Sequence, residues 1–382
     1  MTVNLAQGPG LAGKHASCVY ENEIPSFARQ DMERLYQNTF ASAEAEHVRQ
    51  PGTHTYVAWT GAVVVAVILF HLNGAQARVL NAAIEFDAQA LECFAACLFA
   101  RYPALRAIAL RSVSTGALSG RYPLQKFRST EDVVLNLPPS VDAYMARLGS
   151  AGKRLEYFTR KIRRRLPDFR HAVYEAGNID PALVRSLLAL KLRRNADQLG
   201  HSALDAAQLA WLQRVVAAYG FVAVATVDGQ VCAGAICTRV RDNYFVHVIV
   251  HDPAFDAWGI GIVNTYLTIL AAIERGGREC HFLWGLGGWK FRFLGEPRAL
   301  YDMVMYRSRL ACMACVPTVL DAAGRAWYWR LKADLRAAAA RHPPIERAVA
   351  PWVAGWRRLR QAGPRMTASR GSPTDGPVAH EP

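Results

Sequence analysis

Apolar positions follow two spacings along the chain, and together they predict an ordered series of helices and strands. Residues 25–47 carry apolar side chains at helical intervals, whereas residues 56–72 form an uncharged run whose Thr60-Gly61 break fits two strands joined by a tight turn. Helix, three antiparallel strands, helix and strand form a small α/β unit. The remaining elements of this unit are expected at 78–86 (strand), 88–101 (helix) and 105–110 (strand).

A similar order of elements returns in the second half of the chain. Asp228-Gly229 is a hairpin signal between two of three consecutive strand patterns. The shared order suggests a duplicated unit, although no sequence identity between the halves is visible. We therefore predict an α/β (α+β) fold with two mixed, mainly antiparallel sheets flanked by helices. The elements of the second unit are expected at 181–199 and 206–219 (helices), 221–228, 230–240 and 243–251 (strands), 262–275 (helix), and 281–284 and 301–307 (strands).

Prolines and composition divide the chain into segments. Pro123 and the Pro138-Pro139 pair mark residues 121–139 as a crossing between the two halves. The length of 382 residues agrees with two domains plus an extension, because domains typically hold about 100 to 200 residues. We expect an N-terminal half at 1–134, a second domain at 135–310, a C-terminal helical extension at 311–345, and a basic, largely disordered tail at 346–382.

The balance of charge favours anionic partners. The chain has 45 Lys and Arg against 31 Asp and Glu, a net charge of +14, which suits phosphate-bearing cofactors, nucleic acid or acidic membrane surfaces. Eight basic residues and two acidic ones lie between Lys153 and Arg170, beside a helical apolar stripe. This segment is either a solvated basic face or a contact surface for a phosphate-bearing substrate.

Cysteine usage and the N-terminus predict a cytoplasmic protein. Most of the eight cysteines have apolar neighbours, as reduced core cysteines do. Cys312 and Cys315 form a CxxC without a second pair, so we expect no metal site. No basic segment followed by a long apolar run begins the chain, so no signal peptide is expected. The run at 56–72 leaves a membrane helix open as the alternative to two strands.

A glycine-rich and aromatic stretch at 285–293 is the first candidate site. Gly285, Gly287 and Gly288 permit close approach of the backbone to a ligand, and Lys290 adds a positive charge beside aromatic rings. Lys290 could neutralise a developing oxyanion or a substrate phosphate. The alternative is a glycine turn with solvated Lys and Arg side chains.

The turn after His251 is a second candidate, for a phosphate-bearing cofactor. Backbone N–H groups at the start of a helix bind pyrophosphate, and glycines allow that approach. The cofactor-binding residues predicted here are Trp258, Gly259, Ile260 and Gly261. A helix cap is the alternative.

Polar side chains around these two stretches could carry the remaining chemistry. His247 and His251 share a face of their strand by the period of two, and a histidine is a suitable base near neutral pH. Either histidine could instead be a structural residue. Lys191 and Arg194, about one helical turn apart, could face the same cleft and bind substrate.

Three stretches resemble the GNAT acyltransferase superfamily. Asp256-x-x-Gly259-x-Gly261 reproduces the spacing of its pyrophosphate turn, with Asp where the family has Gln or Arg. The closer likeness is to the CelD-type cellulose-biosynthesis acetyltransferases, which are related to the FemAB aminoacyltransferases. It is carried by residues 137–148 with the Arg-rich helix that follows, by Leu190-Lys191-x-Arg193-Arg194, and by Gly285-x-x-x-Trp289-Lys290-x-x-Phe293. This last motif lacks the acidic residues that the family often places after its first Gly.

The resemblance implies a doubled GNAT fold and an acyltransferase that uses acetyl-CoA or another acyl-CoA. It implies a small-molecule or glycan acceptor. The reacting group would be an amine or hydroxyl of a sugar, of a polysaccharide or of a precursor. Trp289 and Phe293 would bind this substrate. FemAB-like aminoacyl transfer from charged tRNA, in which the basic helix would hold RNA, is one alternative. A non-catalytic module that binds an anionic partner is another.

The C-terminal segment could give the protein a location peripheral to the inner membrane. Tryptophans among arginines are typical of a helix that lies on an anionic membrane surface or docks on a partner. Packing across the two domains is the alternative. The tryptophans concerned are Trp327, Trp329, Trp352 and Trp356.

Overall fold

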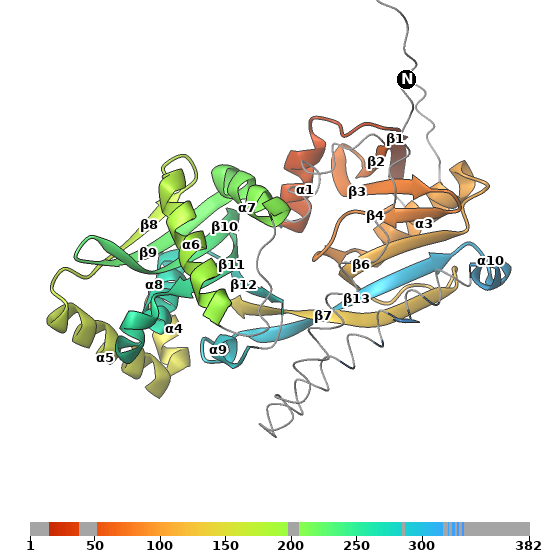
Figure 1. Ribbon diagram of the computed structural model, residues 1–382. Helices are drawn as coiled ribbons and strands as arrows, with labels where there is room; N and C mark the ends of the chain where they lie inside the picture. The colour runs from red at the N-terminus through yellow and green to blue at the C-terminus, as the bar shows by residue number, and fades with distance from the viewer. Residues whose placement is uncertain are drawn as a thin grey trace, which may run out of the picture.

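One continuous sheet of 13 strands, flanked by helices, organises the protein (Figure 1). The computed structural model describes residues 15–37, 52–197, 206–284 and 287–315, together with five positions between 320 and 331. The predicted α/β class with mainly antiparallel pairing is confirmed. The two expected sheets are joined edge to edge into one.

The first half begins at an edge strand and ends near the middle of the sheet. Most of its helices and strands form where the hydrophobic spacing predicts them, and α3 has the expected bounds. The elements are β1 (His15–Tyr20), α1 (Ala28–Tyr36), β2 (Thr53–Thr60), β3 (Val63–Asn73), β4 (Gln76–Val79), β5 (Glu85–Phe86), α3 (Ala88–Arg101) and β6 (Ala107–Thr115).

The second half has the same succession on a larger scale. It comprises α4 (Val141–Leu148), α5 (Ser150–Arg165), β8 (Arg170–Glu175), α6 (Pro181–Asp197), α7 (Ala206–Tyr219), β9 (Gly220–Val227), β10 (Gln230–Val240), β11 (Asn243–His251), the 3-10 helix η1 (Pro253–Trp258), α8 (Ile260–Glu274), β12 (Glu279–Trp284) and α9 (Gly288–Phe291). Three further elements are β7 (Leu124–Asn136), which links the halves, β13 (Glu296–Tyr306) and α10 (Arg309–Ala314).

The strand pairings confirm that the two halves share one order of elements. In the first half β1, β2, β3 and β4 pair antiparallel in succession, and β4 pairs parallel with β6 after helix α3. In the second half β8, β9, β10 and β11 do the same, and β11 pairs parallel with β12 after helix α8. The sheet order is β1-β2-β3-β4-β6-β13-β7-β12-β11-β10-β9-β8.

The halves exchange their last strands. β7 follows β6 in the chain but pairs with β12, and β13 follows β12 but pairs with β6. β7 and β13 also pair with each other, from Glu296 opposite Val134 to Met305 opposite Leu124. Residues 121–139, expected as a crossing, therefore cross as a strand, and the expected boundary at 134 and 135 lies inside it. Each half needs a strand from the other to complete its sheet.

One predicted strand was wrong in its bounds, one strand was missed, and one prediction is confirmed. The strand expected at 78–86 breaks after Val79, because the buried Asn81 side chain accepts from the Leu69 N–H and donates to the Val67 carbonyl, in the place of a strand partner. Strand β8 was not expected. The apolar run at 56–72 forms parts of β2 and β3. No helix among the described residues is long and apolar enough to cross a membrane.

Helices cover both faces of the second half of the sheet. Helices α4 and α8 pack on one face, where Tyr144, Tyr266 and Ile269 join its main apolar core. Helices α6 and α7 pack on the other face through Leu187 and Leu212. Neighbouring strand positions point to opposite faces of the sheet. Only strand residues on the face that α8 covers can therefore contact the N-terminus of α8.

Candidate functional site

The two parallel strands β11 and β12 separate soon after they meet. They pair only from Asn243 to Phe245 and from Glu279 to His281. β12 then bulges, with Leu283 at a φ of +56°, whereas β11 continues to His251. Among the residues that the structure describes, the pairing of β11 with β12 does not continue beyond this point, and backbone groups at such a separation can bind a ligand. Behind the gap, a small cavity between the strands and α8 is lined mainly by apolar side chains, including Val246, Ile249 and Phe282.

A bulge in β11 places the two candidate histidines on opposite faces. The pairing with β10 shifts between Ile236 and Cys237, which leaves His247 as the extra residue. The His247 ring packs against Trp211 of α7, with the ring centroids 5.5 Å apart. His251 lies on the α8 face, against Gly261. The prediction that both histidines share a face was wrong, because the bulge breaks the period of two.

His247 is neutral at physiological pH. Burial lowers its pKa to about 4, and its Nε2 lies 2.8 Å from the Thr238 hydroxyl. A base with this pKa abstracts protons poorly near pH 7. Its surroundings are those of a structural residue under α7.

The predicted cofactor turn sits at the N-terminus of α8. Gly259 takes the left-handed conformation, with φ at +63°, and ends η1 where α8 begins at Ile260. A Cβ on Gly261 would lie 2.4 Å from His251 Nδ1, so only glycine fits beside that ring. Trp258 and Gly259 are half-buried, and Ile260 and Gly261 are buried. A 15-residue helix presents partial positive charge at this end, which favours an anion.

His251 and Asp256 form a pair at the same turn. His251 Nε2 lies 2.6 Å from Asp256 Oδ1. The acidic side chain that departs from the GNAT pattern is therefore held by the imidazole. With Nε2 facing Asp256 and Nδ1 facing Gly261, the geometry makes His251 a residue that shapes the turn.

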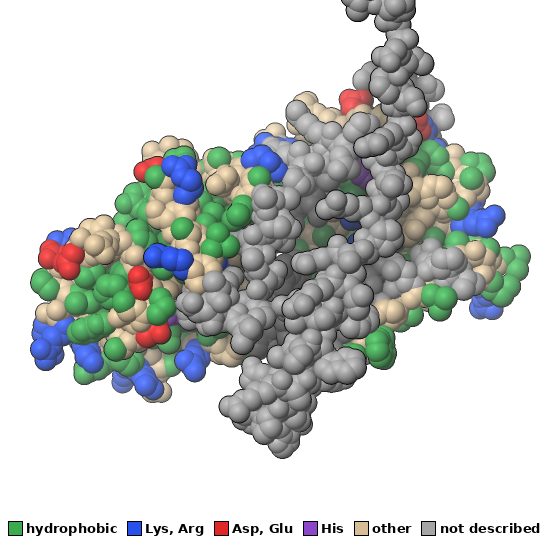
Figure 2. All heavy atoms as spheres, viewed as in Figure 1, with side chains coloured by type: hydrophobic (Ala, Val, Ile, Leu, Met, Phe, Trp, Pro, Cys, Tyr) green, Lys and Arg blue, Asp and Glu red, His purple; other side chains and the backbone are tan. Residues whose placement is uncertain are grey.

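Helix α5 brings a line of positive charge to the turn. Lys161 Nζ lies 5.9 Å from the centre of the Trp258 ring. Leu155 and Ile162 anchor the helix to the core, and the opposite side is basic (Figure 2). No residue of this basic group forms an ion pair with a residue that the structure describes. The group consists of Lys153, Arg154, Arg160, Lys161, Arg163, Arg164 and Arg165.

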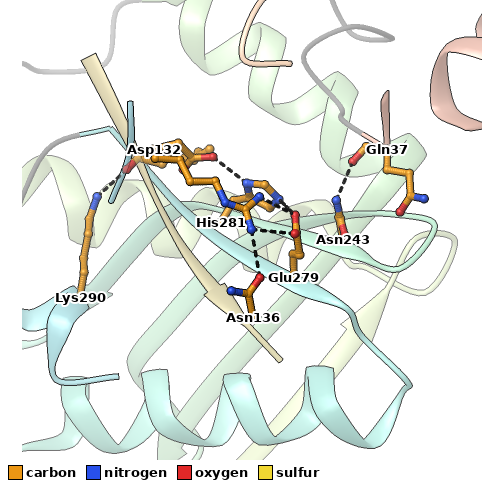
Figure 3. A network of polar contacts seen from close by, with 9 residues as sticks. Gln37, Asp132, Asn136, Asn243, Glu279, His281 and Lys290 are labelled. Carbon is orange, nitrogen blue, oxygen red and sulfur yellow. Dashed lines mark hydrogen bonds and ion pairs between the residues drawn. The ribbon is translucent and has the colours of Figure 1, made fainter. Parts of the chain in front are cut away.

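Lys290 lies inside the protein at the bulge of β12. It comes from the short helix α9, is 4% exposed, and donates from Nζ to the Leu283 carbonyl at 2.7 Å (Figure 3). Burial lowers its pKa to about 8, against the opposing charge of Asp132. Trp289 and Phe293 pack with Phe282, at centroid distances of 5.3 and 6.5 Å. The rings expected to bind substrate thus pack on Phe282, and the Trp289 ring also lies beside Lys290, with its centre 5.9 Å from Nζ.

A network of charges joins neighbouring strands of the sheet, with Asp132 and His281 buried and Arg298 exposed. His281 Nδ1 lies 2.6 Å from Asp132 Oδ2, and its Nε2 lies 3.2 Å from Glu279 Oε2 (Figure 3). Arg298 of β13 donates to Glu279 at 2.8 and 3.1 Å. Phe245 stacks on His281, with the centroids 4.4 Å apart. The network ties the exchanged strands β7 and β13 to β12.

The network favours the charged form of His281. Burial by itself would lower the pKa of His281, but the bonds with Asp132 and Glu279 outweigh it and raise the pKa. Burial would likewise raise the pKa of Glu279, but the bonds from His281 and Arg298 lower it to about 2. Glu279 and His281 share a face by the period of two, a signal visible in the sequence. Asp132 could not be found that way, because its contact depends on the strand exchange.

The other predicted residues are less closely grouped. Lys191 is half-buried on α6, which packs on the face of the sheet opposite α8. The side chain of Arg194 and the residues Gly285 and Leu286 lie outside the described part of the chain. Among the described residues no cluster of three or more His, Cys, Asp or Glu could hold a metal ion.

The second half thus combines antiparallel strands, a parallel pair that separates, and a helix N-terminus beyond the separation. Residues 153–291 match the family described as acetyltransferase (GNAT) domain, which supports the expected relation to the GNAT superfamily. No match was found among the curated proteins.

Solved structures with this fold include FemX, at 10% identity and a TM-score of 0.50, which covers 74% of this chain and 96% of FemX. L-PGS from Bacillus licheniformis has 12% identity and a TM-score of 0.45, with 79% and 96% covered. A tandem GNAT protein from the clavulanic acid biosynthesis pathway has 12% identity and a TM-score of 0.36, with 76% and 98% covered. The FemX likeness shows that the fold extends over both halves; the closer resemblance to CelD-type enzymes stays a prediction.

Proposed function

We propose that the protein is an acyltransferase that moves an acyl group from acyl-CoA, acetyl-CoA foremost, to an amine or hydroxyl. The separation of β11 from β12 carries this proposal, because it leaves a gap that ends at the N-terminus of α8. A thioester donor with an adenine nucleotide would lie in this gap, with its phosphates at Ile260 and Gly261 and beside the basic face of α5. The match of residues 153–291 to the GNAT domain supports the same donor.

The chemistry assigned to the gap is acyl transfer through a tetrahedral intermediate. The donor's carbonyl oxygen becomes an oxyanion while the acceptor loses a proton, and the thiolate then leaves and takes up a proton. In our proposal the Lys290 ammonium neutralises the oxyanion from the end of β12. His251 shapes the phosphate turn through its contact with Gly261, and His247 maintains the packing of β11 on α7.

The acceptor is proposed to be a sugar, a polysaccharide or a precursor of one. This part rests on the CelD-type resemblance, and Lys191 and Arg194 are the proposed acceptor-binding residues. Trp289 and Phe293 would act on the acceptor indirectly, through their packing on Phe282.

Aminoacyl transfer from charged tRNA is the second candidate, and one observation favours it. The seven basic residues of α5 exceed what the phosphates of one CoA molecule need, and they suit a longer polyanion. Lys161 of this group lies beside the same turn, so both candidates place the donor's phosphates there.

Thermal unfolding with each donor separates the candidates. A ligand that binds only the folded state raises stability by about 2.7 kcal/mol at a concentration of 100 times Kd. We expect acetyl-CoA and CoA to raise the Tm, and acetyl-CoA to release free thiol when amino sugars are added. A rise with tRNA alone would favour the second candidate, whereas no rise with either would leave a non-catalytic module.

Substituting Asp256 by Asn is expected to tighten CoA binding. The change removes a negative charge next to the proposed phosphate site, and a unit charge at about 4 Å in water is worth about 1 kcal/mol, or roughly fivefold in Kd. Isothermal titration with CoA measures the effect. Asp228→Asn, at an exposed hairpin of the same half, is the matched control and should leave Kd unchanged. Equal or weaker binding by Asp256→Asn would argue against phosphates at this turn.

A further inference from the structure

The outward side of helix α5 carries a row of exposed cations with one aromatic ring among them. Lys153, Tyr157, Arg160 and Arg164 follow one another at intervals of four, three and four positions, which places them along one side of the helix. All four residues are exposed, and Tyr157 is 56% exposed. We call these four residues the central row of α5.

The central row points away from the core and away from the donor turn. Leu155, Thr159 and Ile162, on the opposite side of the helix, are buried. Lys161, the member of the basic group that lies beside Trp258, is half-buried on one flank of the row. Figure 1 shows α5 at the outer edge of the second half. A large partner can therefore meet the central row without covering the turn.

The positive charge along α5 is not neutralised within the protein. Glu156 and Arg160 have the spacing of a helical ion pair, but among the described residues Arg160 has no such partner. Arg160 with Arg164, and Lys161 with Arg165, are like-charged pairs at i and i+4, which destabilise a helix. A partner that supplies negative charge would offset this cost.

Shape and chemistry limit which partner suits the central row. A second copy of the chain also carries +14, and like charge opposes association. A protein interface needs a buried core that is poor in charge, whereas three of the four residues here are cations. Single-stranded nucleic acid is held in a groove that follows its backbone, whereas the row stands on the convex side of one helix. An anionic bilayer is broad enough to meet a convex helix, and it offers phosphates to the cations and a headgroup layer to the Tyr157 ring.

We infer that the central row of α5 docks the protein on an anionic phospholipid bilayer. Its Lys and Arg side chains would meet the lipid phosphates, and Tyr157 would lie among the headgroups. Clusters of about four to eight cations on an amphipathic helix are typical of such contacts. Docking is independent of the proposed acyl transfer, so either can fail without the other. The membrane contact predicted for the C-terminal segment stays a prediction, because Trp329, Trp352 and Trp356 lie outside the described residues.

Vesicle flotation of the full-length protein tests the inference. We expect the protein to float with vesicles of mixed phosphatidylglycerol and phosphatidylcholine, and to float poorly with phosphatidylcholine alone or at high salt. Each basic side chain near an anionic surface strengthens binding about fivefold, so loss of three should weaken partitioning about 100-fold. The triple variant that tests this is Lys153→Gln, Arg160→Gln, Arg164→Gln. Tyr157→Ala keeps every charge and should weaken binding to a smaller extent.

A second triple variant controls for net charge. Arg78→Gln, Arg185→Gln, Arg241→Gln removes three exposed cations on other elements and should float as the parent does. Thermal unfolding of both triple variants shows whether the fold is retained. Absence of binding to anionic vesicles by the parent, or equal loss of binding in both folded variants, would overturn the inference. So would binding of tRNA that the α5 variant loses while the parent ignores vesicles.

Discussion

Replacing Asp132 by Ala is expected to lower the free energy of unfolding by about 3 to 5 kcal/mol. The substitution leaves the His281 imidazolium buried beside Glu279 without its closer carboxylate, and removing one partner of a buried ion pair has costs of this size. Because Asp132 lies on β7, the loss also weakens the join between the exchanged strand and β12. Denaturation with urea, followed by circular dichroism, measures the effect.

The free energy of unfolding should depend on pH in a way that reflects the charges of this network. The raised pKa of His281 contributes stability that is fully present below its unfolded value near 6.5 and is lost as pH rises through the folded pKa. The pKa of Glu279, lowered to about 2, contributes stability that is present above about 4.5 and is lost as pH falls towards 2. Both contributions are complete between about pH 5 and 6.5.

An Asn variant isolates the charge of Asp132 from its volume. The difference in the free energy of unfolding between the parent and Asp132→Asn should be largest near pH 6. This difference should decrease as the pH rises above the folded pKa of His281. Asp302→Asn is the matched control, because Asp302 is a buried carboxylate at a bulge in β13 that accepts from the Ser112 N–H. A gap for Asp132→Asn that does not vary with pH would mean that His281 is not held as a cation.

Replacing Lys290 by Ala is expected to lower kcat by about 100-fold to 1000-fold. Removal of one group that stabilises an oxyanion has effects of this order. Arg292→Ala, an exposed cation two residues away, should retain activity near that of the parent. Steady-state release of CoA thiol from acetyl-CoA measures both variants.

The pH profile distinguishes two roles for Lys290. If its ammonium neutralises the oxyanion, kcat should fall as pH rises through its pKa of about 8, and this fall should vanish in the residual activity of Lys290→Ala. A rate that rises with pH up to about 8 would identify the neutral amine as the proton acceptor instead. If the pH profile of kcat is unchanged in Lys290→Ala, the role of Lys290 is structural, through its hydrogen bond to the Leu283 carbonyl.

Long elements with a clear period could be predicted from the sequence. Helix α3 and strands β10 and β11 have the expected bounds, because each is a run of mainly apolar residues that ends at polar or turn residues. Strand β7 was missed because its first half is polar, with Lys126, Arg128, Glu131 and Asp132 among its residues. What makes it a strand is pairing on both sides with β12 and β13, which are distant in sequence.

The candidate site was harder to predict than the fold, because more of its contacts depend on pairing between residues that are distant in sequence. The turn at Gly259 and Gly261 is local, so its spacing was visible. The positions of His247 and His251 depend on a bulge set by pairing with β10, which no local pattern shows. The contact of His281 with Asp132 joins residues 149 positions apart. Lys290 was predicted from its motif, but its hydrogen bond to the Leu283 carbonyl at the bulge of β12 could not be seen in the sequence.

The most direct test of the proposed function is the crystal structure of the protein with CoA bound. We expect pyrophosphate at the backbone N–H groups of Ile260 and Gly261, and the pantetheine arm between β11 and β12 with its sulfur directed towards Lys290 at the end of β12. CoA bound at another surface, or an empty gap between β11 and β12 in crystals grown with saturating CoA, would contradict it.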